Sequence, residues 1–87
     1  MLAKHVIVGV HITDRVTNAA LVQEVCTSYG CAIRTRLGLH DTGEEFCSPN
    51  GLLLLEFVGG DDRLAALEAQ LGGIDGLEVQ TMVFDHP

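Results

Sequence analysis

The chain has 87 residues, enough for one small domain and too few for two. Its net charge is −7 with only five Lys and Arg residues, so it would repel a phosphate backbone, and direct binding of nucleic acid is not expected. The sequence contains no run of 18 apolar residues, so a membrane span is not expected. Three cysteines without a secretory leader predict a reducing, cytoplasmic location.

The first half of the chain is typical of a strand, a helix and a second strand. Residues 5–12 are β-branched and alternating, with every second residue from Val6 to Ile12 on one face. Thr13 or Asp14 can cap a helix over residues 15–28, where apolar residues recur every three or four positions. Residues 31–40 alternate again and predict a strand that turns Ile33, Leu37 and Leu39 toward the core.

The second half repeats this order after a loop. Residues 41–51 contain two Gly, a Pro and an Asn, which predicts a loop. Residues 52–58 predict a third strand, residues 61–71 a second helix and residues 77–84 a fourth strand. The whole chain, 1–87, is therefore expected to be a single α+β domain of the ferredoxin-like type, a β-α-β-β-α-β sandwich. Its four-stranded antiparallel sheet would have strand order 4-1-3-2, with two helices on one face.

The face of the sheet away from the helices is too apolar for water. A solvated antiparallel face should be mainly polar, and this one is not, so we predict that it packs against another copy in a dimer or tetramer. The predicted interface residues are Ile7, Leu52, Leu54, Glu56, Met82 and Phe84. The alternative is that these are isolated apolar residues of the kind that any protein surface carries.

Glu56 is the charged member of this predicted interface. It falls in the middle of the third strand, and Arg34 and Arg36 fall on the adjacent strand. We expect an ion pair there that orients the subunits.

A candidate metal site is formed by His40, Cys47 and His11. Imidazole and thiolate are good ligands for transition metals, and a hairpin between the second and third strands can bring His40 and Cys47 together. His11 ends the first strand at the same edge of the sheet. A transition metal ion is therefore the candidate cofactor. In the alternative interpretation, the histidines belong to the interface and Cys47 to an ordinary turn.

No pattern in the sequence indicates an enzyme. The carboxylates are not arranged as an acid and base pair, and there is no Gly-x-Gly-x-x-Gly, P-loop or nucleophile elbow. We therefore predict that the chain has no catalytic residues.

The sequence resembles the iron-only hydrogenase system regulators. The resemblance rests on residues 6–15, residues 33–39, the aliphatic third strand and residues 71–79. It implies an ACT-like regulatory domain, related also to the carboxy-terminal domain of nickel-responsive repressors. Such domains form dimers or tetramers through their sheets and bind small effectors or metal at interfaces. The repressors' His-x-His pattern followed by Cys falls on residues 38–40 and Cys47, with Gly38 in place of the first His.

The leading hypothesis is thus a non-enzymatic, oligomeric regulatory module that senses a small ligand or metal, and whose regulation works through a partner protein. The alternative is a purely structural oligomeric adaptor. A small enzyme on the same fold is a third hypothesis, because this fold hosts many functions.

Overall fold

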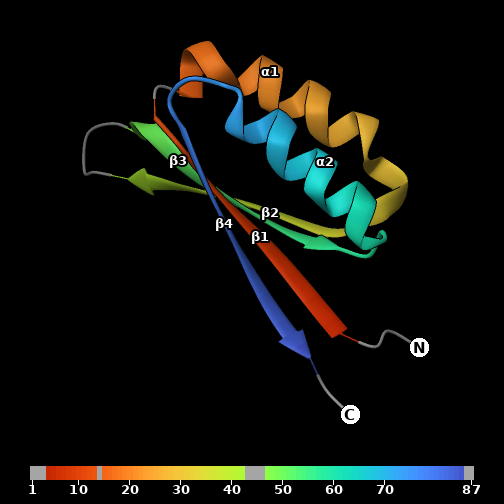
Figure 1. The fold of residues 1–87 in the computed structure, drawn as a ribbon. Helices are drawn as coiled ribbons and strands as arrows, with labels where there is room; N and C mark the ends of the chain where they lie inside the picture. Colours follow the sequence, from red (N-terminus) through yellow and green to blue (C-terminus); the bar gives the residue numbers. More distant parts are fainter. Residues whose placement is uncertain (1–3, 14, 43–46, 86–87) are drawn as a thin grey trace.

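A computed structural model describes residues 4–13, 15–42 and 47–85 (Figure 1). The elements in chain order are β1 (Lys4–Ile12), α1 (Arg15–Ser28), a short 3-10 turn η1 (Gly30–Ala32), β2 (Ile33–Thr42), β3 (Cys47–Phe57), α2 (Asp61–Gly72) and β4 (Leu77–Asp85). The predicted element order is confirmed, and the bounds of α1 match the prediction. Cys31, which was expected to begin the second strand, lies in η1 instead.

The four strands form one antiparallel sheet in the order β2-β3-β1-β4, which is the predicted order read from the other end. Both helices cover the same face of this sheet, and the other face carries none of the described elements (Figure 1). Below, the face away from the helices is called the outer face.

The core lies between the sheet and the helices and is aliphatic. Side chains of β1 and β3 point toward α1 and α2. The largest fully buried side chains include Val8 and Val10 of β1, Leu55 of β3, and Leu67 and Leu71 of α2. Each contributes about 1.5–3 kcal/mol by leaving water. Cys26 is also buried there and behaves as a small apolar residue. Burial raises the pKa of its thiol, which keeps it protonated.

The prediction of which face of the sheet each side chain of β2 lies on was wrong from Thr35 onward. A register shift between Ile33 and Thr35 inserts one extra residue, so the alternation changes phase. Leu37, expected in the core, pairs with Leu54 on the outer face and is 50% exposed. Arg36, expected on the outer face, instead donates a hydrogen bond to Gln23 of α1 on the helix side.

The predicted loop over residues 41–51 is shorter in the structure. β2 continues to Thr42, and β3 begins at Cys47. Pro49 is tolerated within β3 because β1 ends opposite Gly51, so this part of β3 has a neighbouring strand on one side only. The residues between the two strands lie outside those described.

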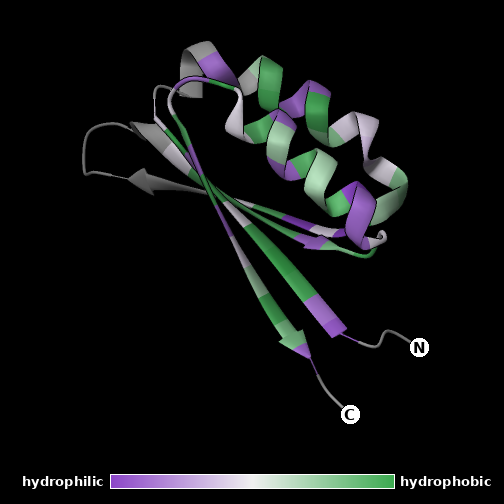
Figure 2. Ribbon diagram, in the orientation of Figure 1, coloured by the Kyte–Doolittle hydropathy of each residue, from purple (hydrophilic) through white to green (hydrophobic). Residues whose placement is uncertain are grey.

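The end of β4 extends beyond the helices. Val83 was expected in the core but is 47% exposed, because the last residues of β4 lie away from both helices (Figure 1). Figure 2 shows that the hydrophobic character of β1 and β4 continues into this uncovered region.

A buried asparagine joins the two turns at the opposite end of the sheet. Asn18 of α1 donates hydrogen bonds to the backbone oxygens of Thr13, 3.0 Å away, and Asp75, 3.1 Å away. The backbone N–H of Thr13 also donates to the oxygen of Gly76 at 2.8 Å. Gly76 has a φ of 86°, and a Cβ there would lie 2.9 Å from the side chain of Asn18. Only glycine fits this position without strain.

Candidate binding groove on the outer face of the sheet

The outer face is apolar, as predicted, over much of its area. Strand register places all six predicted interface residues on this face. Exposure is 38% for Leu52, 56% for Met82 and 54% for Phe84, while Ile7, Leu54 and Glu56 are half-buried. The phase change in β2 adds Leu37, which sequence reasoning had placed in the core. The sequence did not indicate this position of Leu37, because only the pairing of β2 with β3 reveals the bulge.

A groove of about 390 Å³ crosses the middle of this face. Gly9 lies at its centre, between Leu54 of β3 and Gln80 of β4 in the strand register. Because Gly9 has no side chain, the groove stays open between the side chains of the two neighbouring strands. Apolar walls come from Ile7, Leu52, Leu54 and Met82. A groove of this size with mainly apolar walls is typical of a small-molecule site.

One end of the groove is polar. His11 of β1 pairs in register with Glu78 of β4, and both line the groove together with Gln80. The side-chain amide of Gln80 donates a hydrogen bond to Oε2 of Glu78 at 2.7 Å. This bond orients the carboxylate at the end of the groove that His11 also lines. The groove therefore combines an apolar body with a hydrogen-bonding end.

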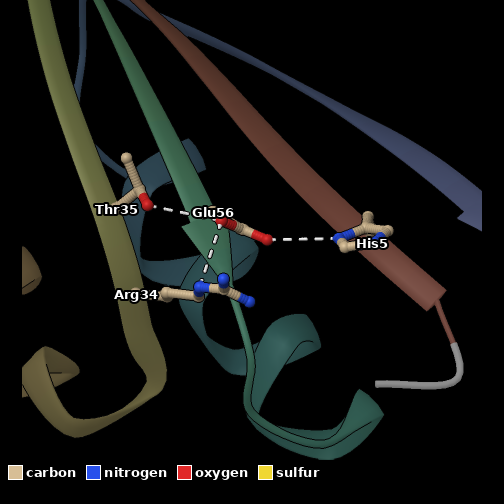
Figure 3. A network of polar contacts seen from close by, with 4 residues as sticks. All are labelled: His5, Arg34, Thr35 and Glu56. Carbon is tan, nitrogen blue, oxygen red and sulfur yellow. Dashed lines mark hydrogen bonds and ion pairs between the residues drawn. The ribbon is translucent and has the colours of Figure 1, made fainter. Parts of the chain in front are cut away.

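A second polar cluster surrounds Glu56 on the same face (Figure 3). Its Oε2 atom lies 3.2 Å from Nδ1 of His5, and its Oε1 atom accepts a hydrogen bond from Thr35 at 3.3 Å. The Nε atom of Arg34 lies 3.8 Å from Oε1, so the expected ion pair is present with Arg34 and not with Arg36.

These neighbours determine the ionisation of Glu56. The hydrogen bond with His5 is the largest cause that holds the pKa of Glu56 below its ordinary value, and partial burial opposes this shift. Arg34 and Thr35 add to the lowering. Sequence reasoning missed His5 and Thr35. Alternation along β1 could have found His5, because it shares the face of Ile7, whereas Thr35 required the bulge.

The predicted metal-binding residues are only partly described. His11 is exposed and lines the groove. For His40 and Cys47 only the backbone is described: His40 pairs with Gly51, and Cys47 pairs with Thr42. Their side chains lie outside the described part, and among the side chains that are described no three His, Cys, Asp or Glu residues gather as metal ligands. The site at His40, Cys47 and His11 therefore stays a prediction.

Within the described ranges, neither helix has the length and apolar character needed to cross a membrane.

The fold defines a ferredoxin-like α+β protein, and comparison with solved structures agrees. The structure is similar to that of the uncharacterized protein TM1266 from Thermotoga maritima, with 25% identity, a TM-score of 0.77 and coverage of 92% of this chain and 96% of that one. It is also similar to a dimeric ferredoxin-like protein from an uncultured marine organism, with 8% identity, a TM-score of 0.53 and coverage of 95% and 94%. At that identity the second likeness shows the fold alone.

No protein-family model matches the sequence. A search of curated proteins likewise finds no match.

Proposed function

We propose that this chain is a non-enzymatic regulatory module that self-associates through the outer face of its sheet and binds a small effector in the groove over Gly9. The apolar outer face carries this proposal. Leu37, Leu52, Met82 and Phe84 each leave more than a third of their surface in water in the single chain. Large exposed apolar patches mark interaction sites, and a second sheet packed on this face would cover all four.

The fold supports self-association. The ferredoxin-like protein from the uncultured marine organism is dimeric and has the same overall fold. The resemblance of the sequence to the iron-only hydrogenase system regulators also implies dimers or tetramers that pack through their sheets. A second copy on the outer face would roof the groove and remove its contents from water.

The groove favours an effector with an apolar body and one polar group. Its volume of about 390 Å³ lies in the range of small-molecule sites. The carboxylate of Glu78, held by Gln80, can accept a hydrogen bond from the polar group of the effector. The apolar walls would contact the rest of the effector.

The ionisation of Glu56 suits a role in an interface. The pKa of Glu56 is lowered by His5 and Arg34, so its carboxylate is ionised near neutral pH and serves as a hydrogen-bond acceptor. A fixed ionised carboxylate suits orientation of an interface.

Native mass spectrometry of the purified protein tests this function. We expect an assembly of two or more copies that retains a small molecule, and we expect Gly9→Leu to lose that molecule while keeping its fold. Gly9→Ala is the matched control, because a Cβ at Gly9 would lie 3.7 Å from its neighbours, at ordinary contact distance. An assembly that never holds a ligand would favour the structural adaptor. A monomer would contradict the proposal as a whole.

A further inference from the structure

β4 is an edge strand with little of the usual protection of an edge. It pairs with β1 through nine consecutive residues, from Leu77 opposite Ile12 to Asp85 opposite Lys4, with no register shift. No other strand of the described residues pairs with its far side. Edge strands are normally blunted by charged side chains (especially Lys), Pro or a bulge. β4 has no Lys, Pro or bulge, and its two charged residues, Glu78 and Asp85, lie near its two ends. The opposite edge, β2, is interrupted by two register shifts.

Three consecutive apolar residues near the end of β4 are exposed on both faces of the sheet. Met82 is 56% exposed, Val83 47% and Phe84 54%. Alternation puts Met82 and Phe84 on the outer face and Val83 on the helix side. Packing of two outer faces would therefore cover Met82 and Phe84 and leave Val83 in water. A partner that adds a strand along the edge of β4 can cover Val83.

We propose that β4 pairs antiparallel with β4 of a second copy, about a twofold axis at Thr81, which extends the sheet to eight strands. This register pairs every residue of β4, whereas a shift in either direction shortens the ladder. The unpaired backbone groups of the edge would then form inter-strand hydrogen bonds. Both helix layers would lie on the same side of the extended sheet.

Side chains on β4 are self-complementary in this register. Val83 lies opposite Val79 of the second copy, and β-branched cross-strand pairs stabilise sheets. The two acidic residues avoid each other, because Glu78 faces Phe84 and Asp85 faces Leu77. A second copy of this chain thus supplies both the strand and the apolar neighbours that the edge lacks.

This edge interface is separate from the outer face. The twofold axis of the edge contact runs perpendicular to the sheet, whereas an axis that packs two outer faces together lies between the sheets. Two perpendicular twofold axes that intersect generate a closed tetramer, so the two interfaces together are expected to give four copies. The edge contact does not depend on the proposed effector, and each interface can be broken alone.

Sedimentation velocity of three variants tests the edge interface. The wild type is expected at the mass of four copies, and Val83→Lys at the mass of two, because a Lys on the edge blocks strand addition. Leu52→Asp, on the outer face, is also expected at two copies, and the double variant at one. Leu21→Lys is the matched control, because Leu21 is 48% exposed on α1, and its mass should equal that of the wild type.

The outcomes separate the two interfaces. A Val83→Lys variant with the same mass as the wild type overturns the edge interface, whether or not Leu52→Asp dissociates. If Leu52→Asp has no effect and Val83→Lys gives monomers, the edge interface stands and outer-face packing fails. Hydrogen exchange gives a second measurement: amides of residues 77–85 should exchange faster in Val83→Lys than in the wild type, with helix amides unchanged.

Discussion

The imidazole of His5 and the carboxylate of Glu56 join β1 and β3 across the outer face, with 3.2 Å between Nδ1 and Oε2. The Glu56 side chain is only 17% exposed, and Arg34 and Thr35 approach its other oxygen. This cluster is one of two polar regions on a face that is otherwise mainly apolar. The charged form of Glu56 is thus stabilised by contacts that exist only in the folded chain.

The stability of the fold should therefore depend on the protonation of Glu56. Because its pKa is lowered in the folded state, the carboxylate contributes stability above its ordinary pKa, and this contribution is lost as the pH falls through the folded value. Urea unfolding from pH about 7 to about 3 should show a smaller loss of unfolding free energy for Glu56→Gln than for the wild type. Glu24→Gln, on the exposed side of α1, serves as the control. Parallel curves for Glu56→Gln and the wild type would refute this role of the cluster.

The phase change in β2 predicts opposite consequences for two leucines. Leu55 is fully buried, so Leu55→Ala should lower the free energy of unfolding by about 2–5 kcal/mol. Leu37 is half-exposed on the outer face, so Leu37→Ser should change it by less than about 0.5 kcal/mol. Both are measured by denaturant unfolding in the Leu52→Asp background, which keeps outer faces apart. A large loss for Leu37→Ser would mean that Leu37 lies in the core after all.

The link between the two turns should be a local contributor to stability. Asn18→Ala removes two hydrogen bonds and leaves the oxygens of Thr13 and Asp75 without this donor. We expect a loss of about 1–3 kcal/mol in thermal or urea unfolding. Ser28→Ala is the control, because the exposed hydroxyl of Ser28 donates a hydrogen bond within α1, to the backbone oxygen of Glu24. Equal, small effects of both variants would show that Asn18 has no special role.

The sequence was sufficient for the element order because each element carries a local signal. The alternation of β1, the apolar stripe of α1 and the glycines at Gly59, Gly60, Gly72 and Gly73 all depend on neighbours in the chain. The strand order then followed from the right-handed crossovers that join parallel strands. The apolar outer face of β1, β3 and β4 was predictable for the same reason.

The faces of β2 were not predictable, because a bulge depends on the partner strand. Nothing in residues 33–36 marks the extra residue, and yet it moves Leu37 outward and Arg36 toward α1. The groove was not predictable from the sequence for a similar reason. Gly9 was expected on the outer face, but its position between Leu54 and Gln80 requires the register of three strands.

Outer-face packing is tested most directly by sedimentation equilibrium of Leu52→Asp beside Leu21→Asp. Both change an exposed leucine to the same acid, one on the outer face and one on α1. The account predicts that Leu21→Asp keeps the mass of the wild-type assembly and that Leu52→Asp lowers it by half. A Leu52→Asp assembly with the wild-type mass would contradict the central claim that the outer face joins subunits.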